Sequence, residues 1–273
     1  MSRDRPVIQL LLCLALAGGA FARPVDAQSS ATQSDTPDEP QANPARPTVS
    51  TPATLTPVGY VQFETGVLGA ADSGEFSSRF GLNEVMKIAV APRLQLLAAS
   101  EPVVHSVTGG IGANGPGGVA LGAQAVLLPG EGVKPTIAIS YFHSVYGGDA
   151  PDLDSGSATN SFTVLASADV KGFHYDTNAL FNEAVDGARR RTQFGQTLSI
   201  SHPIAGKFSM AGEIWHFTQP FLHGNAVGNL WVGSYAAKKD LVFDFGFNRG
   251  LTSTSTQWEA FAGFTYLLPK KLF

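Results

Sequence analysis

The chain has 273 residues, of which 44% are apolar and only 15% charged, and its formal net charge is −4. This length fits one large domain, and so weak a charge argues against a nucleic-acid partner bound through a basic surface. Glycine is abundant, with 30 residues, and phenylalanine (18) far exceeds methionine (3), which favours β structure with tight turns.

The first residues are typical of an export signal. Two arginines precede an apolar run over residues 7–22, and small residues follow it. We expect cleavage after Ala27, with Ala22 as the second choice, so residues 1–27 form a Sec-type signal peptide. The single cysteine, Cys13, would be removed with it, and no disulfide is expected. No later stretch holds about 18 consecutive apolar residues, so no transmembrane helix is expected.

Residues 28–56 consist mainly of Gln, Ser, Thr, Pro, Asp, Asn and Ala, with almost no large apolar side chain. Such a segment cannot bury enough surface to offset the entropy of ordering it, and segments of this composition are usually linkers. We therefore predict a disordered periplasmic extension. The alternative is that the segment tucks into a pore as a plug.

From Pro57 onward, turn signals punctuate the chain at regular intervals, and the segments between them alternate apolar and polar residues. Most of these segments reach the about 9–11 residues that a tilted strand needs to cross the hydrocarbon layer. The pattern predicts twelve strands, at 57–70, 76–90, 93–106, 117–128, 133–147, 158–171, 173–184, 190–204, 206–218, 225–236, 239–250 and 256–268.

The connections between these strands fall into two alternating classes. One class is tight: Ala91-Pro92, Pro129–Gly132, Lys171-Gly172, Ala205-Gly206 and Ala237-Lys238. The other is mostly longer and richer in Gly, Asp, Ser and Thr: 71–75, 107–116, 148–157, 185–189, 219–224 and 251–255. Bacterial outer-membrane barrels have short periplasmic turns and longer external loops. The sequence therefore predicts an all-β fold, a transmembrane antiparallel up-and-down barrel over residues 57–273.

The segment Asp240–Arg249 shows the alternation clearly. A period of two places its phenylalanines on one face and Asp244 and Asn248 on the other. Because a barrel in lipid turns its apolar face outward, we expect the phenylalanines to face lipid and Asp244 to face the lumen. Elsewhere two features fit poorly: Glu84 interrupts an outward apolar series, and Trp215 with Phe217 falls on the lumen side.

Charged residues on the inward face are the candidate lumen-lining residues. They carry both signs: Glu64, Arg79, Lys87, Arg93, Glu101, Asp169, Lys171, Asp176, Glu213, Asp244 and Glu259. One interpretation is a polar constriction that orients a passing solute. The other is that these residues pair with one another and fill the interior, since twelve strands lie between filled and open barrels. We favour mutual pairing for most of them, with a narrow path remaining.

Catalytic and metal sites have weak support. Three histidines are adjacent to a serine: His105 with Ser106, His143 with Ser144, and His202 with Ser201. Adjacent residues of a strand point to opposite faces, so these pairs cannot form a nucleophile and its base. Neither G-x-S-x-G nor H-E-x-x-H occurs, and no spacing matches a zinc or calcium site. We expect no catalytic residue, no metal and no cofactor.

Three parts of the chain carry a family resemblance: Arg79–Leu82 leading to Pro92–Leu96, then Gly212–Trp215, and Asp240–Leu251. In these stretches the chain resembles a family of bacterial outer-membrane proteins named for the meta-pathway of phenol degradation and described as transporters. The resemblance implies an outer-membrane β-barrel that passes small compounds, aromatic ones among them. It implies neither a particular substrate nor functional residues.

The sequence thus predicts a monomeric barrel in the cell outer membrane that mediates passive or facilitated passage of small molecules, with aromatic or hydrophobic ones as one option. Its expected partners are outer-membrane lipid and lipopolysaccharide, the barrel-assembly machinery during insertion, and the small-molecule solute. The alternatives are an outer-membrane lipid-modifying enzyme of the phospholipase or deacylase type, and a narrow structural barrel without transport.

Overall fold

The computed structural model describes residues 39–151, 153 and 158–273. The predicted signal peptide, and residues 28–38 of the predicted extension, lie outside these residues. None of the described residues belongs to a helix that is long and apolar enough to cross a membrane. The strands are β1 (Val61–Ala71), β2 (Ser78–Ala91), β3 (Leu94–Thr108), β4 (Ile111–Gly115), β5 (Val119–Leu128), β6 (Thr136–Tyr146), β7 (Ala158–Val170), β8 (Phe173–Asp186), β9 (Arg189–Ala205), β10 (Phe208–Thr218), β11 (Asn225–Lys238), β12 (Leu241–Gly250) and β13 (Trp258–Leu267).

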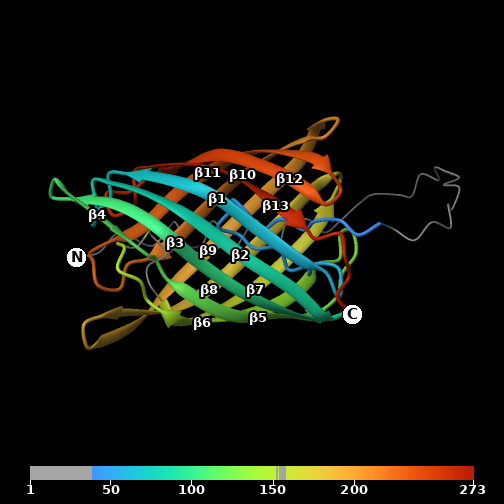
Figure 1. Cartoon of the computed structure of the whole chain (residues 1–273), viewed down its shortest axis with the longest axis horizontal. Coiled ribbons are helices and arrows are strands. Elements are labelled where there is room, and N and C mark those ends of the chain that lie inside the picture. Colours follow the sequence, from blue (N-terminus) through green and yellow to red (C-terminus); the bar gives the residue numbers. More distant parts are fainter. Residues whose placement is uncertain (1–38, 152, 154–157) are drawn as a thin grey trace, which may run out of the picture. The chain divides into compact units, whose positions relative to one another are not determined.

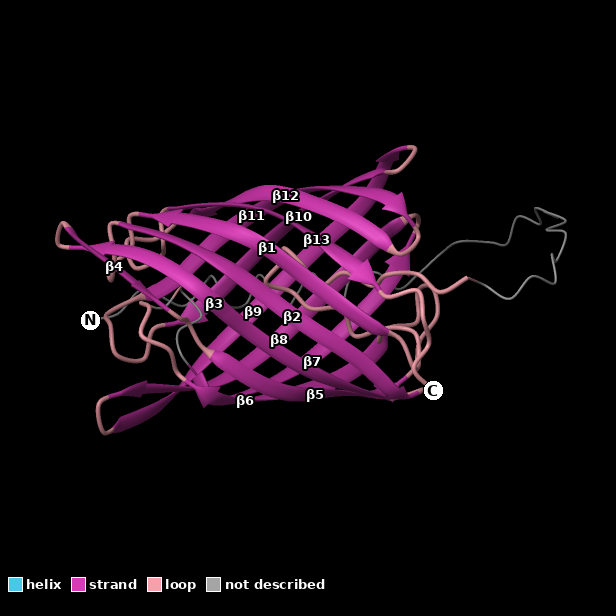
Figure 2. Cartoon of the chain, in the orientation of Figure 1, coloured by secondary structure: helices cyan, strands magenta, loops and turns pink. Residues whose placement is uncertain are grey.

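The strands close into one antiparallel barrel, which confirms the predicted fold (Figures 1 and 2). Strands that follow one another pair side by side, and β1 pairs with β13 to close the ring. The thirteen strands fill twelve places around the ring, because β4 and β5 both pair with β3 and together fill one place. β4 pairs with residues 104–108 of β3, and β5 pairs with residues 94–100. Each of the twelve predicted strands corresponds to one of these places, and β4 lies in the predicted external loop 107–116.

The two ends of the barrel differ. The five tight turns join β2 to β3, β5 to β6, β7 to β8, β9 to β10 and β11 to β12, all at the end where β13 leads to the C-terminus (Figure 1). At the Lys171-Gly172 turn both residues have positive φ, 53° and 84°, as two-residue hairpin turns require. We name this the turn end and the opposite one the loop end. In outer-membrane barrels, the end with the short turns is the periplasmic one.

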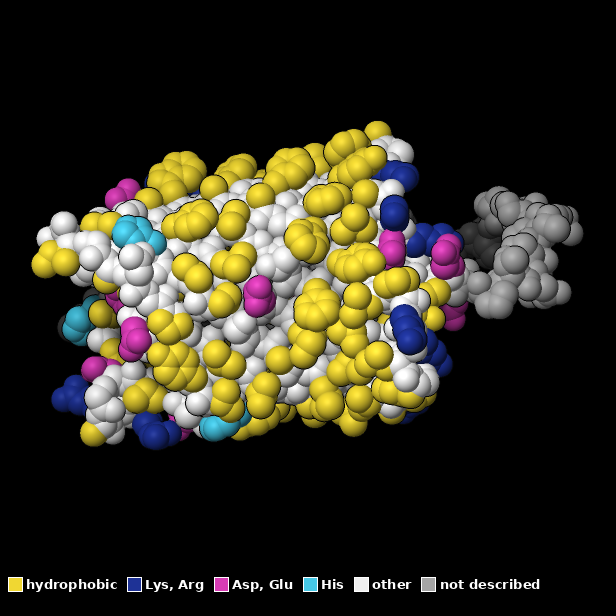
Figure 3. All heavy atoms as spheres, in the orientation of Figure 1, with side chains coloured by type: hydrophobic (Ala, Val, Ile, Leu, Met, Phe, Trp, Pro, Cys, Tyr) yellow, Lys and Arg dark blue, Asp and Glu magenta, His cyan; other side chains and the backbone are white. Residues whose placement is uncertain are grey.

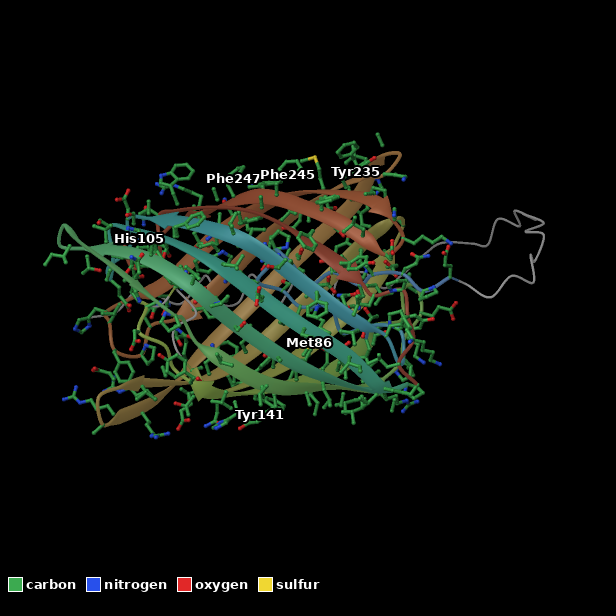
Figure 4. The ribbon with its side chains drawn as sticks, in the orientation of Figure 1. Met86, His105, Tyr141, Tyr235, Phe245 and Phe247 are labelled. Carbon is green, nitrogen blue, oxygen red and sulfur yellow. The ribbon has the colours of Figure 1, made fainter. Side chains whose placement is uncertain are left out.

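The outer surface of the wall is apolar. Phe243, Phe245 and Phe247 are 45%, 56% and 46% exposed, whereas Asp244 and Asn248 on the opposite face are buried. Figure 4 shows Phe245 and Phe247 pointing away from the barrel, and Figure 3 shows apolar side chains over most of the visible wall. The predicted orientation of this strand is therefore confirmed, and the surface suits a hydrocarbon environment.

The structure contains both features that fitted the alternation poorly, the inward aromatic residues of β10 and the outward Glu84. Trp215 and Phe217 face the lumen and are each 2% exposed. Their rings pack where Gly228 and Gly195 on the neighbouring strands leave room, since a Cβ at either glycine would overlap a ring. Glu84 faces outward and is exposed, at a register shift between β2 and β3, and it accepts a weak hydrogen bond from Ser100 at 3.4 Å.

Residues 39–60 begin outside the turn end and run into the barrel (blue in Figure 1), and we call them the lumen loop. The loop enters at the turn end, where the Ala42 N–H donates to the Lys239 carbonyl at 2.8 Å, and returns there, where the Gly59 N–H donates to the Ala89 carbonyl at 2.9 Å. The prediction of disorder is therefore wrong for residues 39–56, and the alternative of a segment tucked into the pore describes them. Disorder was expected because the segment has few large apolar side chains, whereas the loop is held mainly through its backbone.

Candidate functional site: the lumen

Polar side chains of the barrel wall hold the backbone of the lumen loop. They accept loop N–H groups as follows: Gln62 from Asn43 (2.8 Å), Glu64 from Ala45 (3.1 Å), Glu213 from Val49 (3.1 Å) and Ser50 (2.9 Å), Asn178 from Thr51 (2.6 Å), Ser167 from Ala53 (2.7 Å) and Gln95 from Thr56 (2.9 Å). The amides of Gln62, Gln124 and Asn178 also donate to loop carbonyls. Buried backbone groups need such partners, so the wall replaces the water that a free segment would bind.

Arg46 is the single cationic residue of the lumen loop. Its Nη2 lies 3.5 Å from Oδ1 of Asp244, which is buried. The guanidinium occupies a recess in the wall formed by Gly66 on β1 and Gly263 on β13, because a Cβ at either position would overlap it. The two glycines therefore provide a place for this side chain that any other residue would block.

Four of the eleven candidate lumen residues form two ion pairs with each other. Lys87 contacts Glu64, and both are buried. Nearer the loop end, Nη2 of Arg79 lies 2.6 Å from Oε2 of Glu101. Asn83 donates to the other oxygen of Glu101 at 3.0 Å. These four residues pair with one another, which is fewer than the majority that we expected to pair.

Four further candidates face the lumen with other partners. Glu213 binds the loop backbone, and Asp244 faces Arg46. Asp176 accepts hydrogen bonds from Ser167 and His174, and Glu259 accepts one from Asn248 at 3.0 Å. Lumen carboxylates therefore serve the loop as well as the wall.

The remaining three candidates, Arg93, Asp169 and Lys171, are exposed at the turn end. Arg93 and Lys171 belong to turns rather than strands. Asp169, next to last in β7, bonds His174 at 2.8 Å with its side chain 65% exposed. The alternation assigned all three inward, which is wrong for Arg93 and Lys171 because they lie beyond the strands, whereas Asp169 continues the inward series of β7 at the turn-end rim.

The uncharged residues that bind the loop were not among the predicted site residues. Gln62, Gln95, Gln124 and Asn178 are all buried on the inward face. The sequence does show amide side chains at inward positions of several strands. They were not selected because only charged residues were considered as candidates. Arg46 was missed because it lies in a segment assigned to disorder.

A cavity of about 430 Å³ lies between the lumen loop and the loop end. Its wall is polar at Asn83, Ser140 and Glu259. Apolar side chains from several strands line it as well: Phe142, Leu180, Trp215, Phe217, Leu230 and Phe261. The Trp215 indole N–H donates to Asn248 at 2.8 Å, which fixes the ring against the cavity. The size is within the range of small-molecule sites, and the wall presents both hydrogen-bonding groups and aromatic faces.

None of the three histidines next to a serine is placed as a general base toward that serine. Nδ1 of His105 bonds Asn114 at 2.8 Å, Nδ1 of His143 bonds Asn160 at 3.0 Å, and Nδ1 of His202 bonds the Gly172 carbonyl at 2.9 Å. Figure 4 shows His105 toward the loop end. Within the described residues, no group of three or more His, Cys, Asp or Glu could hold a metal ion.

Comparison with solved structures identifies the fold. The structure is similar to an outer-membrane channel from Pseudomonas putida F1, with a TM-score of 0.57 and 11% identity over 79% of this chain and 98% of that one. It is also similar to the NanC porin, with a TM-score of 0.54 and 12% identity over 75% of this chain and all of that one. No protein-family model and no curated protein sequence matches the chain. The chain thus has the fold of outer-membrane β-barrels.

Proposed function

We propose that the protein mediates the passage of small molecules across the outer membrane through its lumen. The observation that carries this proposal is the cavity of about 430 Å³ between the lumen loop and the loop end. A barrel that served only as a structural element would gain stability from filling this space with side chains. The two similar structures, a channel and a porin by their names, support the same direction.

The cavity wall favours solutes that combine an apolar part with a polar group. The rings of Trp215 and Phe217, with centroids 5.8 Å apart, offer an aromatic surface, and Asn83 and Glu259 offer hydrogen-bonding groups. The lumen wall and loop hold more carboxylates than cations. The carboxylates are Glu64, Glu101, Asp176, Glu213, Asp244 and Glu259, against the cations Arg46, Arg79 and Lys87. The excess negative charge favours neutral and cationic solutes over anions.

In this proposal the lumen loop is the barrier of the path, because it occupies the turn-end half of the lumen and the cavity opens on its other side. A solute crosses when the loop shifts within the lumen. The hydrogen bonds that hold the loop are individually modest, so the loop can exchange between positions without unfolding the barrel.

The cellular setting belongs to the same proposal. The chain is exported by its signal peptide and inserted by the barrel-assembly machinery as a monomer. We also propose membership of the family named for the meta-pathway of phenol degradation. The stretches that carry this resemblance lie at the ends of β2 and β3, in β10 and along β12. We assign no catalytic role to the protein.

Flux into proteoliposomes tests the proposal. The full chain, reconstituted from detergent, is expected to admit small neutral aromatic alcohols and aromatic amines faster than aromatic carboxylates of the same size. A correctly folded barrel, identified by its heat-modifiable migration, that admits none of these solutes above the rate of protein-free liposomes would refute the proposal. Equal rates for the amine and the carboxylate would refute the charge preference alone.

A further inference from the structure

A row of aromatic side chains crosses the outer surface of β6, β7, β8 and β9. Tyr141 is paired with Phe162, Phe162 with Phe181, and Phe181 with Phe194. Ring centroids are 6.4 Å apart between Phe162 and Phe181 and 5.3 Å apart between Phe181 and Phe194. Figure 4 shows Tyr141 pointing away from the barrel. Such rows mark the boundary between the hydrocarbon layer and the lipid headgroups.

Immediately beyond this row, toward the loop end, the same four strands carry connected polar side chains. The Asn160 amide donates to Glu183 at 2.6 Å. Its oxygen lies 2.5 Å from the Tyr141 hydroxyl and 3.0 Å from Nδ1 of His143. Arg190 donates to the other oxygen of Glu183 at 2.8 Å. We call Tyr141, His143, Asn160, Glu183 and Arg190 the headgroup cluster.

The contacts of Asn160 determine the tautomer of His143. Because only the amide nitrogen can donate to the Glu183 carboxylate, the Asn160 oxygen must accept from both Tyr141 and His143. Nδ1 of His143 therefore carries the proton. Nε2 is then left as an acceptor on an exposed ring.

Arg190 is the cation of the cluster. Its side chain is 61% exposed, and the contact with Glu183 uses one of its nitrogens, Nη1. A guanidinium has five N–H donors, so most of its donor edge faces outward. The neighbouring Arg191 is already engaged, because it donates to the Pro220 carbonyl and lies over the Phe221 ring at 5.4 Å. Arg189 and Arg191 nevertheless keep the region basic.

The height of the cluster relative to the membrane follows from the register. His143 is two residues beyond Tyr141 on β6 and pairs with Asn160 on β7. Two residues of a strand correspond to about 7 Å. The cluster thus lies just outside the hydrocarbon boundary, at the level of headgroups in the leaflet at the loop end.

We propose that the headgroup cluster binds a phosphorylated glycolipid of the external leaflet, of the lipid A type. The Arg190 guanidinium holds a phosphate through charge-assisted hydrogen bonds, and Nε2 of His143 accepts a hydrogen bond from a sugar hydroxyl. The acyl chains lie along the aromatic row. Asn160 is a positioning residue, since it orients His143, whereas the Glu183 carboxylate competes with the phosphate for the Arg190 guanidinium. This site is separate from the lumen and does not depend on solute passage.

Native mass spectrometry of the full chain with diphosphoryl lipid A tests the site. Arg190→Gln is expected to weaken binding about tenfold, the worth of one charge-assisted contact. Glu183→Gln leaves the guanidinium without its carboxylate and is expected to bind at least as tightly as the unaltered chain. The matched control is Arg249→Gln. Arg249 lies near the loop end of β12, donates to Gln257 and lies over Trp258.

Results of two kinds would overturn the proposal. One is binding by Arg190→Gln at the level of the unaltered chain, or an equal loss in Arg249→Gln, which would show a nonspecific basic rim. The other is equal binding of phosphatidylglycerol, which carries a phosphate without the sugar. Because Glu183→Gln and Arg190→Gln are expected to act in opposite directions, a general loss of folding cannot reproduce the expected pattern.

Discussion

The two halves of the lumen use the same alternating strands in different ways. In the turn-end half, wall side chains such as Glu213, Asn178 and Gln95 bind the backbone of the lumen loop. In the loop-end half, Arg79 binds Glu101, and Trp215 binds Asn248, so wall side chains bind one another and leave a cavity. Polar side chains on the inner face therefore either bind the lumen loop and fill the lumen, or bind one another and leave space.

The difference shows what closes the lumen. Twelve strands do not fix whether a barrel is filled or open. Here the half whose wall side chains bind the loop backbone is filled by a segment of small residues, and the half in which Arg79 binds Glu101 remains open. Changing the partners in one half should thus alter passage without altering the other.

The largest effect is expected from deleting residues 39–56, joining residue 38 to residue 57. The deletion removes every loop group that the wall side chains bind and opens the turn-end half to water. Conductance in planar bilayers should rise severalfold, while the heat-modifiable migration of the barrel persists. A folded deletion variant with the conductance of the full chain would show that the loop is not the barrier.

The next largest effect is expected from Glu213→Gln. The carboxylate accepts two loop N–H groups, from Val49 and Ser50, and an amide can accept them with one oxygen only. Hydrogen bonds to charged groups are each worth about 1.5–3 kcal/mol. The fraction of time spent in a high-conductance state should rise about tenfold in single-channel records.

Glu101→Gln is the matched control for that variant. It removes the same charge from the lumen, but Glu101 binds Arg79 and Asn83 in the loop-end half. Its open fraction should stay that of the unaltered chain. Equal increases in both variants would mean that lumen charge, rather than the loop contact, governs opening.

A smaller effect, on selectivity, is expected from Phe217→Leu in the loop-end half. The ring packs against Gly195 and lines the cavity, and leucine keeps the apolar character while losing the aromatic face. The flux of aromatic alcohols relative to aliphatic alcohols of equal size should fall a few-fold in proteoliposomes, with conductance nearly unchanged. An unchanged ratio would remove the aromatic wall from the selection of solutes.

The smallest effect is expected from Asp244→Asn. The carboxylate faces Arg46 across 3.5 Å, a long contact, so the loop should stay in place. One negative charge leaves the lumen, and the cation-to-anion permeability ratio from reversal potentials should decrease slightly. A large rise in conductance would instead show that this pair holds the loop.

Much of the wall was predictable, because its chemistry is local. Alternation along Asp240–Arg249 fixed the direction of Phe245 and Asp244, and the tight turn at Lys171-Gly172 fixed a strand end. Trp215 seemed misplaced because the room for its ring comes from Gly228 on the adjacent strand, and the alternation within one strand does not show what faces it from another.

The lumen loop was not predictable in the same way. Its composition correctly shows that it cannot form a hydrophobic core, but its binding comes from N–H and C=O groups that every residue has. The complementary signal lies on the wall, at Gln62, Gln95 and Asn178, from three different strands. Only the closed ring brings these amides around one segment.

The position of the lumen loop constrains the order in which the barrel assembles. The loop leads directly into β1, and β1 forms the seam with β13 through ten register pairs. A segment that enters and returns at the turn end need not be threaded through the ring, but its wall partners on β3, β7, β8 and β10 surround it only when the barrel is nearly closed. We therefore expect the loop to take its place in the lumen as the seam forms, so that closing the ring and filling it are coupled steps.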